Sequence, residues 1–134
     1  MIPEFRAYDS GSLTRMYQPD EVMVCDGNIW IIDEDDVAGS WIVNNDLNLM
    51  QSTELFDKNG KEIFEGDILE VTDKYSWLEV VSYSQEKAMF VTEEINREFK
   101  VPESPLYDLL DSTFLKFKVI GNIYENPELL EVER

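Results

Sequence analysis

The stretch that most constrains the fold is residues 55–71, because it contains a strong turn signal between β-rich segments. Asn59-Gly60 tolerates two successive residues at positive φ, as a type I′ hairpin turn requires. Asp57 precedes this pair by two positions and can accept hydrogen bonds from the backbone of the same turn. The sequence therefore predicts a chain reversal near Lys58 and Gly60, and it predicts that Gly60 adopts a positive φ.

The residues after this turn favour two further strands. Glu65-Gly66-Asp67 interrupts the run, as at a bend or bulge between strands. The β-branched, aromatic and aliphatic residues around it are Ile63, Phe64, Ile68, Leu69 and Val71. The plain interpretation of the whole stretch is a structural hairpin without a functional site.

An earlier hairpin is predicted from residues 22–25 and 28–32, which flank the turn dipeptide Asp26-Gly27. We expect Trp30 to lie in a core. Cys25 lies beside the turn, and the chain has no histidine that could act as its base. We therefore expect Cys25 to be structural.

The rest of the chain also predicts mainly strands, which the alternation of apolar and polar residues places at 2–8, 40–43, 47–51, 77–83, 88–92 and 114–124. Residues 93–101 fit a helix or a strand, and we favour an extended edge. Ser104-Pro105 fits the N-cap and first position of a short helix. Asn126-Pro127 is expected to cap a last helical turn. This turn would pack Leu129 and Leu130 against the small barrel that the strands from residue 55 onward are expected to form. Gly121 is expected to let the final strand bend.

Three segments of the chain together resemble the YopX family of phage and prophage proteins. They are the opening residues 2–9, the central residues 57–68 and the late residues 119–130, so the resemblance covers essentially the whole chain. It implies a small, mostly β protein from phages of Gram-positive bacteria, with an SH3-type barrel in its later part. It implies no catalytic residues.

The predicted fold class is mainly β, with a small SH3-like barrel and one or two short helices. Residues 1–53 are expected to form a β-rich arm or sheet, and residues 54–134 the barrel. One continuous domain and an up-and-down sandwich are the alternatives. A chain of 134 residues with 43% hydrophobic residues is large enough to bury a core.

Charge and cysteine content restrict the function and the compartment. The chain has 11 basic and 29 acidic residues, for a net charge of −18, which disfavours direct nucleic-acid binding through a broad basic face. Its single cysteine excludes an internal disulfide and fits a reducing compartment. The start of the chain lacks the pattern of a signal peptide and no apolar run is long enough to span a membrane, so we expect the cytoplasm of a bacterial host.

No motif in the sequence points to catalysis, a metal or a cofactor. Residues 33–36 are consecutive acids, and a calcium loop instead places its ligands at alternate positions. The series Asn44, Asp46, Asn48 begins such spacing, but Leu49 and Leu55 occupy its glycine and glutamate positions. We expect no enzymatic activity, no cofactor and no metal site.

The distribution of charge is the most informative feature for function. Residues 16–57 include no lysine or arginine and ten acids. The plain interpretation is a solvated face. The functional interpretation is a docking surface for a basic host or phage protein, or for a DNA-binding protein whose groove it occupies as a mimic. The predicted partner-binding residues are Asp33, Glu34, Asp35, Asp36 and Trp41.

The leading hypothesis is a non-enzymatic protein-binding or regulatory accessory protein of a phage or prophage, with self-association through exposed strand edges. The first alternative is a small-barrel module associated with nucleic acid, through a local patch of Lys58, Lys61, Lys116 and Lys118. The second alternative is a carboxylate-dependent enzyme.

Overall fold

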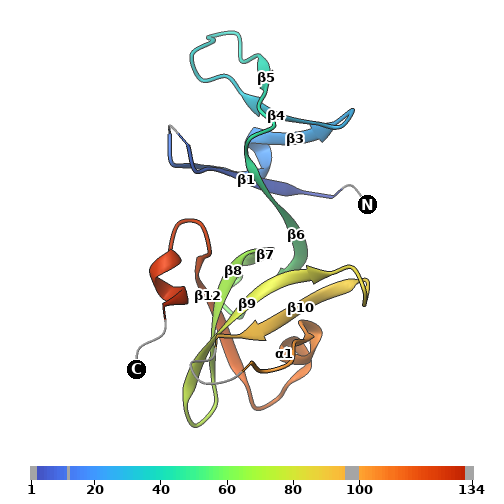
Figure 1. Cartoon of the computed structure of the whole chain (residues 1–134), viewed down its shortest axis with the longest axis vertical. Coiled ribbons are helices and arrows are strands. Elements are labelled where there is room, and N and C mark those ends of the chain that lie inside the picture. The colour runs from blue at the N-terminus through green and yellow to red at the C-terminus, as the bar shows by residue number, and fades with distance from the viewer. Residues whose placement is uncertain (1–2, 12, 96–99, 132–134) are drawn as a thin grey trace. The chain divides into compact units, whose positions relative to one another are not determined.

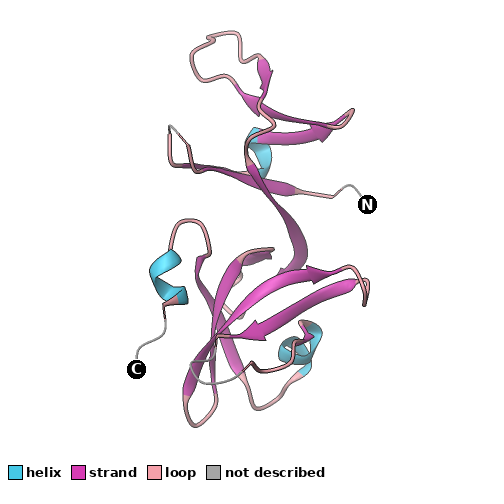
Figure 2. Ribbon diagram, in the orientation of Figure 1, coloured by secondary structure: helices cyan, strands magenta, loops and turns pink. Residues whose placement is uncertain are grey.

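The computed structural model describes residues 3–11, 13–95 and 100–131, and the chain is mainly β (Figures 1 and 2). It divides into two compact units, Met1–Ser52 and Thr53–Arg134. None of the helices in the described ranges has the length and apolar character needed to cross a membrane.

The described residues of the first unit form six strands or parts of strands and one 3-10 turn. In chain order they are β1 (Phe5–Asp9), β2 (Arg15–Tyr17), η1 (Pro19–Glu21), β3 (Val22–Cys25), β4 (Asn28–Ile32), β5 (Trp41–Val43) and the start of β6 (Asn48–Phe56). Strand β1 pairs with β2 and with the start of β6, while β3, β4 and β5 form a separate antiparallel sheet. The buried core consists of Ala7, Tyr17, Val22, Ile31 and Leu47.

The β3–β4 hairpin confirms the predicted turn at Asp26-Gly27. Both residues have positive φ, 53° and 76°, and Cys25 pairs with Asn28 on either side of them. This is the pattern of a two-residue type I′ turn.

The second unit contains the end of β6 and all later elements. They are β7 (Glu62–Phe64), β8 (Asp67–Thr72), β9 (Ser76–Ser84), β10 (Met89–Glu94), β11 (Ser104–Pro105), α1 (Tyr107–Asp111), β12 (Lys116–Asn122) and η2 (Pro127–Leu130). Five strands form an antiparallel sheet in the order β11-β10-β9-β8-β12. The buried core is made of Ile63, Leu69, Val71, Val81, Leu106, Leu109 and Phe117.

The central turn has a positive φ at Gly60, as predicted, but its predicted type was wrong. Gly60 has a φ of 82°, whereas Asn59 has no positive φ, so the turn is not type I′. Gly60 N–H donates to the Asp57 carbonyl at 3.0 Å, and Asp57 N–H donates to the Lys61 carbonyl at 2.9 Å. This is a three-residue loop in which the last residue is left-handed.

The predicted short helix and the predicted last helical turn are both present, but each differs in detail. The helix starts at Tyr107, and Ser104-Pro105 instead forms β11, which pairs with β10. The helical turn η2 follows Asn126 and begins at Pro127, but the Asn126 side chain makes no capping hydrogen bond and Leu130 stays 37% exposed. Of the segment 93–101, residues 93 and 94 end β10, and residues 96–99 lie outside the described part of the chain.

The predicted bend in the final strand is confirmed as a register shift between β12 and β8, located between Val119 and Gly121. A Cβ atom on Gly121 would lie 2.4 Å from Oδ1 of Asn126. That same oxygen accepts a hydrogen bond from Asn122 N–H at 3.1 Å. Glycine is therefore needed here because a side chain would clash with Asn126. Backbone conformation is not the reason, since the φ of Gly121 is not positive.

Replacing Gly60 with Val should lower the free energy of unfolding by about 1 kcal/mol or more, because a β-branched residue is strained in the left-handed region. Nothing lies within 4 Å of the added Cβ, so the loss comes from the backbone alone. Gly60→Asn is the matched control and should lose less, since Asn tolerates positive φ. Denaturant unfolding measures both; equal midpoints for wild type and Gly60→Val would refute this account of the turn.

Gly121→Ala should lower the free energy of unfolding by about 1–3 kcal/mol, the usual cost of overpacking. The added methyl group displaces the Asn126 side chain and breaks its bond to Asn122. The double variant Gly121→Ala/Asn126→Ala removes the two closest contacts, to Oδ1 and Cγ of Asn126, so its loss should be smaller than the sum of the two single losses. Strict additivity in denaturant unfolding would contradict the clash.

Candidate functional site

One face of the β3–β4–β5 sheet is apolar and open to solvent. Paired residues of antiparallel strands share a face. The register aligns Met23, Trp30 and Val43 in one row and Ile32 and Trp41 in the next. We call these five residues the outer face.

The opposite face of the same sheet is covered only in part. Val22 and Ile31 on that face are buried in the core of the first unit, whereas Val24 and Ile42 on it are 43% and 44% exposed. On the outer face, Met23 is 42%, Trp41 36% and Val43 44% exposed. A row of large apolar side chains in water is unusual for a single protein surface and typical of interaction sites.

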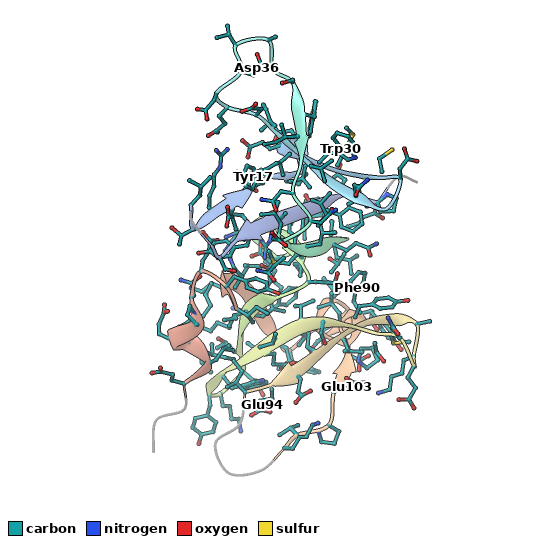
Figure 3. The ribbon with its side chains drawn as sticks, turned by 45° about the horizontal axis from the view of Figure 1, so that its top comes forward. Tyr17, Trp30, Asp36, Phe90, Glu94 and Glu103 are labelled. Atoms are coloured by element: carbon teal, nitrogen blue, oxygen red, sulfur yellow. The ribbon has the colours of Figure 1, made fainter. Side chains whose placement is uncertain are left out.

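Trp30 was predicted in a core, and this was wrong. It is half-buried on the outer face of β4 and belongs to neither core cluster (Figure 3). Its indole Nε1–H donates to the Cys25 carbonyl at 3.3 Å. Alternation along β4 correctly separates Trp30 from Ile31, but it does not tell which side is covered.

The loop between β4 and β5, residues 33–40, is the acidic loop. Figure 3 labels Asp36 in this loop. The acids of the loop are organised by local hydrogen bonds. Asp33 Oδ1 accepts from Asp35 N–H at 3.1 Å. Asp36 accepts from Ala38 N–H at 2.9 Å and from the Ser40 hydroxyl. These bonds are typical of aspartates in turns.

Glu34 is balanced by a cation. Arg15 of β2 forms ion pairs with Glu34 and, at 2.7 Å, with Glu21. The guanidinium also lies 4.5 Å from the centre of the Tyr17 ring. The hydrogen bond from Arg15 lowers the pKa of the Glu34 carboxyl. Arg15 thus links one side of the acidic loop to β2 through a solvent-exposed ion pair.

The four predicted acids therefore have different roles. Asp33 and Asp36 shape the loop and Glu34 pairs with Arg15, which leaves Asp35 exposed with no recorded side-chain partner among the described residues. Trp41 pairs with Ile32 directly beside the loop. The structure thus joins the predicted acids to an apolar face that includes Trp41, but the sequence did not indicate the other four outer-face residues as a group.

The second unit holds a pocket of about 280 Å³ on the exposed side of the β8–β12 pair. Across this pair Lys116 faces Thr72 and Lys118 faces Glu70. The lining consists of Lys58, Asn59, Glu70, Thr72, Lys116, Phe117 and Lys118. Three of the four lysines predicted as a patch are thereby brought together, and Lys61 is not part of the lining.

The hairpin loop that supplies Lys58 is held against β12 by Asp57. This buried carboxylate accepts from Asn59 N–H and Lys61 N–H at 2.9 Å through Oδ1. Its Oδ2 accepts from Val119 N–H, also at 2.9 Å. The pocket wall is therefore fixed by charge-assisted hydrogen bonds to the backbone.

Within residues 3–11, 13–95 and 100–131, no group of three or more His, Cys, Asp or Glu side chains is arranged to hold a metal ion. Cys25 is an exposed free cysteine at the β3–β4 turn.

Comparison with known proteins identifies similar chains. A family model described as YopX protein matches residues 4–131. The crystal structure of protein EF1440 from Enterococcus faecalis is 32% identical, with a TM-score of 0.65, and the match covers 98% of this chain and 99% of that chain. No curated protein matches.

Ser40→Ala should raise the pKa of Asp36 toward its ordinary value, because the Ser40 hydroxyl is the main cause of its lowering, ahead of Ala38 N–H. A lowered pKa in the folded state stabilises the loop above the ordinary pKa, and this stabilisation is lost as the pH falls through the folded value. Carboxyl NMR titration measures it, with Glu34 as the internal control. An unchanged Asp36 pKa would contradict the role of Ser40.

Proposed function

The chain belongs to the YopX family, and on that premise we propose that it is a non-enzymatic protein-binding module of a phage or prophage. The single observation that carries the proposal is the exposed outer face beside the acidic loop. Apolar area supplies affinity on burial, and surrounding charge selects the partner and speeds encounter.

The partner that fits this surface is a basic protein with apolar side chains at its contact site. Acids flank the outer face at both ends, with Asp26 in the turn of the β3–β4 hairpin and Asp35 in the acidic loop. The stretch from residue 16 to residue 57 contains no base to offset them. A second copy of this chain would bring like charges together, so charge complementarity favours a different, basic protein.

For the second unit we propose an SH3-like barrel. The antiparallel order β11-β10-β9-β8-β12 supports this, as does the pairing of β8 with β9 on one side and β12 on the other. The bend at Gly121 supplies curvature of the kind that a closed small barrel needs. The bacterial cytoplasm is the proposed compartment, and the free Cys25 is compatible with its reducing conditions.

The proposal predicts that one partner depends on both the apolar and the acidic part of this surface. Wild-type protein and variants are used to capture proteins from lysates of the bacterial host, with and without phage induction. Trp41→Ser should abolish capture of that partner, since buried aromatic anchors dominate interface energy. Tyr75→Ser is the matched control, because Tyr75 is 81% exposed in the second unit.

Kinetics with the purified partner then tests the role of charge. Asp35→Asn removes a charge without removing a hydrogen bond that shapes the loop, so it should slow association and leave dissociation nearly unchanged. Association should also slow as salt rises. Two outcomes would count against the proposal. One is a lysate with no Trp41-dependent partner, and the other is a partner whose association rate changes neither with salt nor with Asp35→Asn. Competition by duplex DNA would identify the partner as a nucleic-acid-binding protein and the surface as a DNA mimic.

A further inference from the structure

The pocket of the second unit concentrates positive charge in a strongly acidic protein. Its lining contains Lys58, Lys116 and Lys118 against a single acid, Glu70. The whole chain has only 11 basic residues and a net charge of −18. Three ammonium groups around one small cavity repel one another, and a bound anion would reduce that repulsion.

Two of these lysines are available to a ligand. Lys118 lies 3.7 Å from Glu70, an ion pair at a half-exposed site, where such pairs contribute little. Lys58 and Lys116 have no ion-pair partner among the residues that the structure describes. Both are exposed, so each ammonium can turn toward the cavity without breaking an internal bond.

The pocket also has a fixed frame and neutral donors. Asp57 holds the loop bearing Lys58 and Asn59 against β12 through the bond from Val119 N–H. Lys116 and Lys118 are two positions apart on β12, which places both on one face of the ladder, opposite Thr72 and Glu70. The Asn59 amide adds an uncharged donor to the lining, and the Thr72 hydroxyl, which shares a hydrogen bond of 3.0 Å with the Ser76 hydroxyl, adds a polar group.

From this arrangement we propose that the pocket is a binding site for a phosphate group. Lysine binds phosphate as a point charge, and a dianion is best neutralised by several ammonium groups that converge on it. The volume of about 280 Å³ is small for a ligand pocket and admits a phosphate with a limited part of its carrier. The carrier is either a free phosphorylated small molecule, such as a mononucleotide, or the backbone of a single-stranded nucleic acid.

The site is independent of the outer face, because it lies wholly within the second unit and uses none of the same residues. A local affinity for phosphate at this site is compatible with the strong negative charge of the whole chain. Long nucleic acids meet strong repulsion elsewhere on the protein, whereas a single phosphate experiences mainly the nearby lysines, since salt screens charges beyond about 10 Å at 0.1 M.

The test is NMR titration of the full chain with three probes: inorganic phosphate, adenosine monophosphate and a short oligothymidylate. Saturable shifts are expected at the amides of Asn59, Thr72 and Lys118. Lys58→Gln and Lys116→Gln should each weaken the affinity by about fivefold or more, as loss of one charged contact does. Lys61→Gln is the matched control: Lys61 carries the same charge on the same loop but does not line the pocket, so its variant should bind nearly as wild type does.

The probes distinguish the carriers. Tightest binding of the monophosphate assigns the site to a free small molecule, whereas tighter binding of the oligothymidylate with a steep salt dependence assigns it to a nucleic-acid backbone. Absence of a saturable shift with all three probes overturns the proposal. Equal weakening by Lys58→Gln and Lys61→Gln also overturns it, since that result indicates diffuse attraction and no site.

Discussion

The arrangement of the second unit depends on one buried carboxylate. Asp57 is 6% exposed and accepts three backbone hydrogen bonds, two within its own turn and one from Val119, 62 residues later. Charged hydrogen bonds of this kind are stronger than neutral ones, and a buried carboxylate without them would be costly. The interaction therefore fixes a local turn and a long-range contact at once. The contact between the central turn and β12, and with it the wall of the lysine pocket, depends on it.

Other carboxylates also accept hydrogen bonds from backbone N–H groups, and these bonds explain how a chain with 29 acidic residues folds. Asp67, fully buried, accepts from Phe64 N–H at 2.8 Å, and Asp36 and Asp33 shape the acidic loop. Each of these carboxylates replaces its lost hydration with backbone donors. The acids without such partners, of which Asp35 is an example, contribute charge to the surface and nothing to the turns. The negative charge of the protein is thus partly structural and partly available for recognition.

Local chemistry in the sequence predicted much of the fold. Asp26-Gly27 predicted a two-residue turn with both residues at positive φ, and the mainly β class and the membership of the YopX family are confirmed. The failures involve competition between local signals and tertiary pairing. Ser104-Pro105 carries a helix-start pattern, but its backbone pairs with β10. Asn59-Gly60 forms a longer loop because the Asp57 carboxylate accepts a hydrogen bond from Lys61 N–H on the other side of the turn. Propensity describes what a segment prefers alone and not which partner it finds.

The candidate site shows the same limit of local sequence patterns more clearly. Alternation places Trp30 and Val43 on one face of a strand pair, but only the three-dimensional structure shows that Ile31 on the other face is buried in the core of the first unit. Likewise, Lys58 and Lys116 are 58 positions apart, and no local pattern relates them. Their proximity follows from the bond between Asp57 and Val119, which brings the central turn to the final strand. A surface that depends on such long-range pairing cannot be recognised from spacing along the chain, so its function has to be argued from the charge and exposure that the fold brings together.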